Sequence, residues 1–270
     1  MASQVSDNLT ITSVQVRKAL LTAFKAKRPV FLWGPPGIGK SEVVAEVAAE
    51  LNGPVIDLRM AQMEPTDIRG IPYFNKDINK MDWAAPVDLP SEEFAAEHPI
   101  VVLFLDEMNS AAPSVQAAGY QLILNRRIGK YRLPDNVVIV AAGNRDSDKG
   151  VTYRMPSPLA NRFVHLEVRP DFDAWQQWAV NNRIHKDVVG YLNYQKGDLF
   201  NFDPSVHDRS FPTPRSWSFV SDLLDDDMTD NEQTDMVAGC VGEGLAIKFM
   251  AHRKISKDLP NPADILAGKV

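Results

Sequence analysis

The chain has 270 residues, 44% of them hydrophobic and 24% charged, which is ordinary for a globular protein of one large domain or a large and a small one. A net charge of −6 argues against a global basic field for nucleic acid or anionic membranes, and the one cysteine, Cys240, excludes an intramolecular disulfide. No apolar run approaches the roughly 18 residues of a membrane span, and residues 1–10 lack a signal-peptide pattern, which predicts a cytoplasmic protein.

The first predicted elements are a leading helix and a short buried strand. Apolar residues at helical spacing predict a helix over residues 13–25, and the apolar run 29–33 is typical of a buried parallel strand. The strand leads directly into a complete G-x-x-x-x-G-K-[ST] phosphate-binding loop, which reads Gly34-Pro35-Pro36-Gly37-Ile38-Gly39-Lys40-Ser41. A helical pattern follows from Glu42 to Leu51 and ends at Asn52-Gly53-Pro54.

This order of strand, glycine-rich loop and helix predicts nucleotide binding. The glycines allow the backbone to wrap a phosphate chain, and the N-terminus of the helix points its N–H groups at the anion. Lys40 is expected to reach the β- and γ-phosphates, and the Ser41 hydroxyl to ligate Mg²⁺. We therefore predict that residues 34–41, together with Glu42, bind ATP with Mg²⁺.

Strands and helices then alternate as far as residue 169. Apolar runs predict strands over 55–58, 100–105, 137–142 and 163–168, and residues 114–124 are predicted to form one of the helices between them. Alternating strands and helices with continuously apolar strands favour a parallel sheet covered on both faces. The fold predicted for residues 1–169 is thus α/β, a phosphate-loop three-layer α/β/α domain.

Residues 170–270 are predicted to form a small, all-helical lid domain. Helices are expected over 173–180 and 187–194, and Thr213-Pro214-Arg215 offers an N-cap followed by proline at the first helical position. Thr229 to Glu232 reads as a capping box before a helix that includes residues 236–250. Trp175 and Trp178, three residues apart, are expected in the core, as is Cys240.

Two carboxylates end the strand predicted over 100–105. An acidic residue at that place holds Mg²⁺ in phosphate-loop NTPases, so Asp106 is a candidate metal ligand. Glu107 is a candidate base for polarising the attacking water. Two solvated carboxylates at a strand end are the alternative, and the phosphate-binding loop upstream favours the catalytic interpretation.

Three further polar residues are candidates for the site. Asn144 follows the strand 137–142, where it would orient the lytic water or contact the γ-phosphate; the alternative is a turn asparagine. Arg162, just before the strand 163–168, is a candidate arginine finger, and an arginine with a structural carboxylate partner is the equally weighted alternative. Arg215 would reach the nucleotide from the lid or serve only the surface.

Other charged groups are given structural interpretations. The run Asp225-Asp226-Asp227 is interpreted as a solvated helix end or turn rather than a metal site. The five histidines are scattered without the spacing of metal ligands, so no zinc site is predicted.

Taken in order, these motifs resemble those of AAA+ ATPases, in the MoxR-like and dynein-related branch. The resemblance covers about residues 13–225. The loop resembles the Walker A motif, and the segment from Val101 to Glu107 resembles the Walker B motif. Asn144 resembles the sensor 1 residue, the segment from Ala160 to Phe163 resembles the arginine-finger segment, and the segment from Thr213 to Arg215 resembles sensor 2. The resemblance implies a homo-oligomeric ring, commonly a hexamer, in which Arg162 completes a neighbour's site and Arg126 or Arg127 also reaches across. It also implies that the Pro-rich segment 70–98 lies near a pore or on a ring face, and that a separate von Willebrand factor A domain protein is a partner.

The function favoured by the motif set is an ATP-hydrolysing, chaperone-like motor that remodels a protein partner. The alternatives are a slow-turnover nucleotide switch or assembly factor and a nucleic-acid motor or loader, for which no appended nucleic-acid module is evident. A small-molecule kinase is disfavoured by the predicted lid and by the Asn144 and Arg162 pattern.

Overall fold

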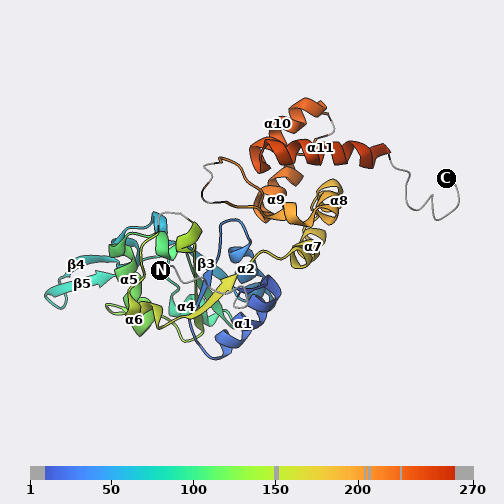
Figure 1. The fold of residues 1–270 in the computed structure, drawn as a ribbon. Helices are drawn as coiled ribbons and strands as arrows, with labels where there is room; N and C mark the ends of the chain where they lie inside the picture. The colour runs from blue at the N-terminus through green and yellow to red at the C-terminus, as the bar shows by residue number, and fades with distance from the viewer. Residues whose placement is uncertain (1–9, 149–151, 204, 206–207, 226, 259–270) are drawn as a thin grey trace. The chain divides into compact units, whose positions relative to one another are not determined.

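The computed structural model describes residues 10–148, 152–203, 205, 208–225 and 227–258. The chain divides into two compact units, residues 1–169 and 170–270, which are drawn in Figure 1. Among the described residues, the buried hydrophobic side chains of the first unit form two core clusters and those of the second unit form one. In the part of the chain described, no helix combines the length and the apolar character needed to cross a membrane.

The first unit is built on a six-stranded sheet in which every strand pair is parallel. The central strands are continuously buried, as expected for a sheet covered on both faces. In sheet order the strands are β1 (Thr10–Ile11), β10 (Val164–Val168), β2 (Val30–Trp33), β9 (Val137–Gly143), β6 (Val101–Asp106) and β3 (Val55–Arg59).

Alternating side chains of these strands enter two separate cores. On β6, Val102 and Phe104 pack with α1 (Ser13–Lys25) and α2 (Lys40–Glu50), whereas Leu103 and Leu105 pack with helices of the opposite face. Those helices are α3 (Pro65–Arg69), α5 (Pro113–Asn125) and α6 (Ser157–Ala160). The three-layer α/β/α prediction is therefore confirmed, and with it the predicted helix over residues 13–25.

The structure adds elements to this unit that the sequence did not predict. The segment 70–98, interpreted as a polar connection, contains the antiparallel hairpin of β4 (Ile71–Asn75) and β5 (Lys80–Ala84) and the helix α4 (Glu92–Ala96). A smaller hairpin of β7 (Arg127–Ile128) and β8 (Tyr131–Arg132) follows α5. β4 and β5 project from the rest of their unit (Figure 1), and most of their side chains are exposed, so they lack the buried run that marks the other strands.

Short 3₁₀ turns fill several of the connections. They are η2 (Met60–Gln62), η3 (Met108–Ser110) and η4 (Asp146–Asp148) in the first unit and η5 (Lys196–Leu199) in the second. The turn η3 matters for function because it directly follows the carboxylates that end β6.

Helices make up the regular structure described in the second unit. They are α7 (Phe172–Asn181), α8 (Lys186–Tyr194), α9 (Pro214–Leu223), α10 (Asp230–Val241) and α11 (Glu243–Asp258). The predicted caps of Thr213 and Thr229 are confirmed, because each side chain accepts the N3 backbone N–H of its helix.

The single helix predicted to include residues 236–250 is wrong. Gly242 has φ of 92°, a left-handed value that few other residues adopt, and it separates α10 from α11. Helical spacing on both sides of the glycine made one helix plausible from sequence. The break lets α10 and α11 pack on each other and share one core.

Aromatic side chains form the centre of that core. Tyr191, Trp217 and Phe249 are in mutual ring contact and are fully or almost fully buried. Trp175 is buried with them and Trp178 packs against the cluster, as predicted. Cys240 is half-buried at its margin, and burial raises the pKa of its thiol.

A buried ionic network links three helices of the second unit. The Arg253 guanidinium on α11 donates to the carboxylate of Asp187 on α8 over 2.9 Å and to the amide oxygen of Gln233 on α10 over 2.6 Å. Arg253 is only 5% exposed, so water could not replace the hydrogen bond that its guanidinium would lose if one partner were removed.

We predict that Arg253→Met destabilises the second unit by about 3–5 kcal/mol, because it leaves the largely buried Asp187 carboxylate and the buried Gln233 amide without their closest partner. Lys254→Met, at the exposed neighbouring position, is the matched control and should change stability by less than about 0.5 kcal/mol. Hydrogen exchange of the α8 and α11 amides measures the effect. Equal protection in the two variants would contradict it.

Candidate active site

The phosphate-binding loop lies where β2 ends and α2 begins. Gly37 and Gly39 have φ of 75° and 86°, left-handed values that allow the loop to turn sharply into the helix. Gly39 is the N-cap of α2 and has no side chain to accept hydrogen bonds from the first N–H groups of the helix. These N–H groups are therefore available to bind an anion. The local backbone therefore has the features that phosphate binding requires.

The side chains of the loop are arranged around Lys40. Its ammonium group donates to the carbonyls of Gly34 over 2.7 Å and of Pro35 over 2.9 Å, which folds the side chain back over the loop. Ser41 follows in the first turn of α2 and is partly buried, and Glu42 is exposed in the same turn. The loop also contacts the neighbouring strand, since the Gly34 N–H donates to the Gly143 carbonyl over 3.3 Å.

The two candidate carboxylates lie at the same edge of the sheet. Asp106 is the last residue of β6, on the face that Phe104 turns toward α2. Its Oδ1 accepts the backbone N–H of Glu107 over 2.9 Å. Glu107 is exposed and has φ of 53°, a conformation that costs a residue with a side chain roughly 1–3 kcal/mol. Asp106 thus ends β6 on the face covered by α2, and Glu107 begins the turn that follows the strand.

Asp57 is a third carboxylate near this pair, and sequence reasoning missed it. Partial burial raises the pKa of Asp57, and repulsion by Asp106 and Glu107 raises it further, against a smaller lowering by Arg59. β3 pairs with β6 so that Arg59 lies opposite Asp106. In the sequence, Asp57 is the one acidic residue of an otherwise apolar predicted strand. Nothing in that strand indicates that it lies near Asp106 and Glu107.

Asn144 lies where the sequence analysis expected it. β9 and β6 are adjacent and parallel, so Asn144, directly after β9, shares an edge of the sheet with Asp106. A second asparagine, Asn109 in η3, is 1% exposed, and its Nδ2 donates to the Asn144 carbonyl over 2.7 Å. Asn109 therefore links the turn after Glu107 to Asn144, a role that sequence reasoning did not assign.

Asn109 is tightly enclosed and incompletely bonded. A Cβ on Gly143 would lie 2.1 Å from its Oδ1, so only glycine fits at the end of β9. The same Oδ1 has no hydrogen-bond partner among the described residues. A buried polar atom of this kind is unusual in a folded protein and occurs here beside the predicted site.

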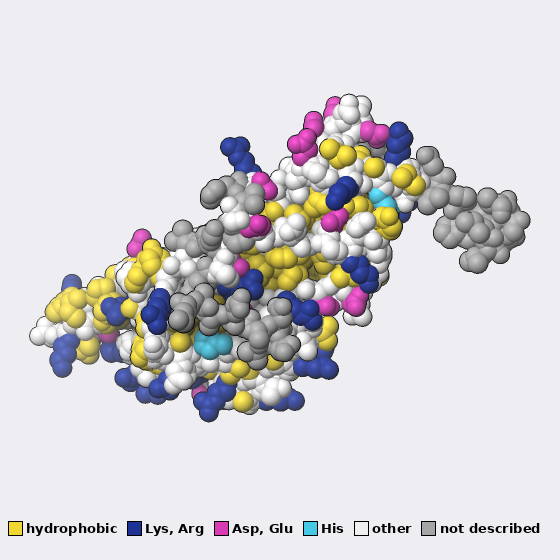
Figure 2. Space-filling view, viewed as in Figure 1, with side chains coloured by type: hydrophobic (Ala, Val, Ile, Leu, Met, Phe, Trp, Pro, Cys, Tyr) yellow, Lys and Arg dark blue, Asp and Glu magenta, His cyan; other side chains and the backbone are white. Residues whose placement is uncertain are grey.

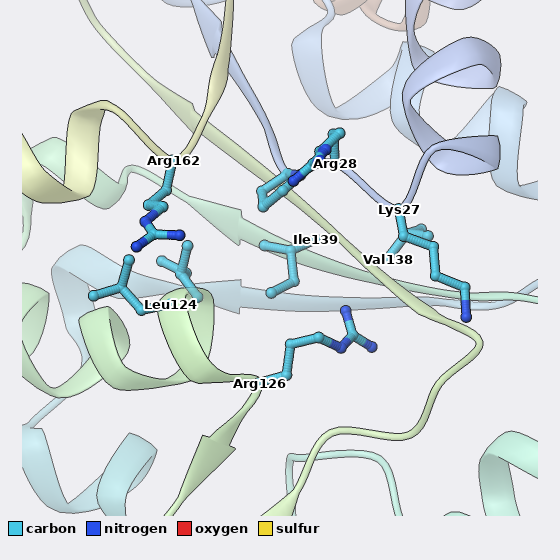
Figure 3. Close-up of a pocket in the computed structure, with 9 residues that line it drawn as sticks. Lys27, Arg28, Leu124, Arg126, Val138, Ile139 and Arg162 are labelled. Carbon is cyan, nitrogen blue, oxygen red and sulfur yellow. The ribbon is translucent and has the colours of Figure 1, made fainter.

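Arg162 lies at the opposite edge of the sheet. It precedes β10 and lines a pocket of about 160 Å³ with residues that precede β2 or begin β9, whereas the phosphate-binding loop follows β2. Figure 3 shows its guanidinium on one side of Ile139, with Arg126 and Lys27 on other sides. Among the described residues, the side chains of Lys27, Arg28 and Arg162 have no hydrogen-bond or ion-pair partner.

Arg126 has a structural role within its own chain. It is the left-handed C-cap of α5, with φ of 51°, and its Nη2 donates to the carbonyls of Pro134 over 2.7 Å and Val137 over 2.8 Å. Burial lowers the pKa of its guanidinium, which the nearby Asp135 partly opposes. Arg127 is exposed in β7.

A hydrogen-bonded chain connects the two edges of the sheet. Trp33, the residue before the loop, donates its indole N–H to Nδ1 of His165 over 2.8 Å. Because Nδ1 accepts, neutral His165 carries its proton on Nε2 and donates it to the Ala160 carbonyl, also over 2.8 Å. Ala160 ends α6, immediately before the turn that holds Arg162. The position of the finger segment is thus tied to the strand that enters the loop.

The remaining sequence candidates lie in the second unit. Arg215 is exposed in the first turn of α9, next to the proline at N1. Asp225 and Asp227 are exposed, and the Asp227 N–H donates to the Asp225 carboxylate, while Asp226 lies outside the described residues. Over the described part of the chain, no group of three or more His, Cys, Asp or Glu side chains is arranged to hold a metal ion.

These residues fit Mg²⁺ bound together with a nucleotide better than a metal bound by protein alone. Mg²⁺ typically takes one or two protein ligands together with substrate phosphates and water. Ser41 at the start of α2 and Asp106 at the end of β6, whose helix and strand pack on each other, supply such a pair of oxygens. The N-terminus of α2, which has no side-chain cap, and the Lys40 ammonium supply the electropositive surroundings that phosphates need.

Comparison with known proteins gives one family match. Residues 30–169 match the model of the "ATPase family associated with various cellular activities (AAA)". Curated relatives include a replication factor C large subunit of Aeropyrum pernix, 31% identical over 58% of this chain and 29% of that protein. A proteasome-associated ATPase of Mycobacterium leprae is 26% identical over 67% of this chain and 31% of its own length. Midasin of Giardia intestinalis is 24% identical over 74% of this chain and 4% of its own length.

The chain therefore spans about a third of the first two of these relatives. Among solved structures, a RuvB variant of Thermotoga maritima aligns with a TM-score of 0.47 at 18% identity, covering 88% of this chain and 69% of that one.

We predict that Gly143→Ala displaces Asn109 and costs about 1–3 kcal/mol of stability, because the new methyl group has no space. Nucleotide turnover should fall with it, since Asn109 holds the backbone of Asn144. Gly239→Ala, an exposed helical position with nothing within 4 Å, is the control and should stabilise the protein by about 0.5–1 kcal/mol. Thermal unfolding and phosphate release measure both effects; a Gly143→Ala protein as stable as the parent would contradict the packing argument.

Proposed function

Because the chain belongs to the AAA family of ATPases, we propose that it binds ATP with Mg²⁺ and hydrolyses it at a site shared between two copies. The observation that carries this proposal is the separation of Arg162 from the phosphate-binding loop of its own chain. The loop follows β2, while Arg162 lies in the pocket at the start of β2 and β9. Four residues of β2 span about 10 Å, so an arginine at the far edge serves another copy's nucleotide.

Within one chain, the loop residues hold the phosphates. The N–H groups at the start of α2 and the Lys40 ammonium bind phosphate oxygens, for which Lys40 exchanges its present carbonyl partners. Ser41 and Asp106 hold Mg²⁺, which neutralises charge on the β- and γ-phosphates when bound. Gly34 to Gly39 and Glu42 complete the nucleotide-binding segment.

Glu107 and Asn144 prepare the attacking water. Glu107, exposed in the turn after β6 at the edge of the sheet that carries the loop, would accept a proton from the water. Asn144 orients the same water, and Asn109 fixes the backbone of Asn144 from the turn that follows Glu107. Arg162 from the neighbouring copy stabilises negative charge on the transferred phosphoryl group.

An assembly built this way is head-to-tail, because the two surfaces that meet come from opposite edges of one sheet. Closure gives a ring, and six copies is our proposal from the resemblance to the MoxR-like and dynein-related branch. We further propose that Arg215, on the small helical lid, senses the nucleotide, that the ring remodels a protein partner, and that it works with a separate von Willebrand factor A domain protein.

We predict that Glu107→Gln slows ATP hydrolysis at least about a hundredfold while ATP binding is retained, because the amide cannot accept the proton. Glu97→Gln removes an exposed carboxylate outside the proposed site and should keep most of the activity. Steady-state phosphate release and binding of a fluorescent ATP analogue make the comparison. Undiminished turnover in Glu107→Gln would refute the assignment, and negligible turnover in the parent chain would favour the alternative of a nucleotide switch.

We predict that Arg162→Ala and Lys40→Ala are each inactive alone and regain ATPase activity when mixed. Each mixed interface can combine an intact loop from one copy with an intact arginine from the other. Arg162→Ala should lower turnover by about a thousandfold with ATP binding intact. Arg183→Ala, an exposed arginine of the second unit, is the control. If mixing restores nothing, or if a monomer shows full activity, the shared site is refuted.

A further inference from the structure

The β4–β5 hairpin concentrates exposed apolar side chains to a degree found in no other element of the described chain. Phe74 is 55% exposed and Met81 63% exposed, although both are large apolar residues. Figure 2 shows hydrophobic side chains gathered at the end of the first unit where Figure 1 places this hairpin. Contiguous apolar surface of this kind marks interaction sites in folded proteins. The exposed set is Ile71, Tyr73, Phe74, Ile78, Met81 and Trp83.

The pairing of the two strands divides these side chains between two faces. Pro72 lies opposite Trp83, and Phe74 lies opposite Met81, so these four residues share one face. The other face carries Ile71, Tyr73 and Asn75 with their partners Ala84, Asp82 and Lys80. We call the Pro72, Phe74, Met81 and Trp83 side the apolar face of the hairpin.

The base of the hairpin is fixed by contacts that leave Phe74 and Met81 of the apolar face exposed. Asp82 is buried and accepts from the Lys130 ammonium of the β7–β8 turn over 2.5 Å and from the Asn75 amide over 3.3 Å. The Arg69 guanidinium lies 5.9 Å from the centre of the Trp83 ring. A hairpin of two strands is marginally stable alone, so these contacts are what present the face in one position.

The surroundings of the apolar face are basic, in contrast to the whole protein. Between residues 69 and 84 and between 127 and 132 there are six Lys or Arg and two Asp, and one of those two, Asp82, is already paired with Lys130. The complete chain has a net charge of −6. The cations are Arg69, Lys76, Lys80, Arg127, Lys130 and Arg132.

We propose that the apolar face binds an extended, acidic and apolar segment of a partner polypeptide. This deepens the proposed function, because it names the class of protein on which the ATPase would act. A strand of five residues is about 17 Å long, which suits a chain segment better than a folded partner that buries about 800 Å² on each side. Acidic residues of the segment would meet Arg69 and the exposed Arg127 and Arg132, while its apolar residues contact the apolar face.

The arrangement of charges favours polypeptide over single-stranded nucleic acid. Stacked bases need aromatic faces interleaved with cations along one groove. Here Lys80 lies on the face opposite to Phe74 and Trp83, and the apolar face itself contains proline and methionine, which provide no stacking surface. Methionine instead suits a surface that accepts varied apolar side chains.

The test is binding of labelled 16-residue peptides to the full chain in ATP and Mg²⁺, followed by fluorescence anisotropy. One peptide alternates Glu with Leu or Phe, a second replaces Glu by Lys, and a third replaces the apolar residues by Ser; oligo(dT) is the nucleic-acid probe. Phe74→Ser with Met81→Ser removes the exposed pair of the apolar face. Ile247→Ser with Ile255→Ser, at equally exposed positions on α11, is the matched control.

We expect the acidic and apolar peptide to bind the parent at least tenfold more tightly than the other probes. Its affinity should fall at least tenfold in the Phe74 and Met81 variant and stay unchanged in the control. Equal binding by parent and variant, tighter binding of the Lys peptide or of oligo(dT), or a change of oligomeric state confined to the Phe74 and Met81 variant would each overturn the proposal. ATP hydrolysis is measured on the same samples: the Phe74 and Met81 variant should keep its basal rate, and Glu107→Gln should still bind the peptide, so failure of either proposal leaves the other standing.

Discussion

The parallel direction of one buried sheet is the constraint on which the rest of this protein depends. Because β2, β6 and β9 run the same way, their carboxyl ends deliver the phosphate-binding loop, Asp106 and Asn144 to one edge. The amino ends lie at the other edge, where Arg162 precedes β10. Complete burial of β6 and β9 fixes this arrangement, since helices on both faces leave neither strand an alternative register. A site that needs both edges therefore needs two copies.

The same constraint explains why the two edges are also connected within one copy. Trp33 lies on β2 and His165 on β10, adjacent parallel strands, so their side chains meet beside the sheet and reach the turn before Arg162 through the Ala160 carbonyl. These two hydrogen bonds thus join the strand that enters the loop to the turn that carries Arg162. In the proposed head-to-tail assembly, each copy would contribute its loop to one site and its arginine to another, so this link would lie between two successive sites.

The strands and the phosphate-binding loop could be predicted because they follow continuous sequence patterns. Residues that matter through a single contact in the folded chain could not. Five strands were recognisable because each is an apolar run, and the loop because its glycines and Lys40 have fixed spacing. Asp57 and Asn109 were missed, since nothing local indicates that the strand and turn carrying them lie beside Asp106 and Asn144. The β4–β5 hairpin was missed because Pro72 and the mostly polar residues 75–80 interrupt its apolar residues, which therefore form no continuous run. The break at Gly242 was missed because only its backbone angle shows that the helix ends there.

The helix α5 lies along the chain between the turn after Glu107 and the β7–β8 hairpin, which contacts the β4–β5 hairpin. α5 follows the turn after Glu107 and ends at Asn125, where Arg126 fixes its C-terminus to the backbone before β9. The β7–β8 turn comes next and holds Asp82 of the hairpin through Lys130. The hairpin is thus anchored to an element that directly follows a packed helix. If the apolar face binds a polypeptide as proposed, α5 is the packed element that lies along the chain between the turn at Glu107 and the hairpin contact of Lys130.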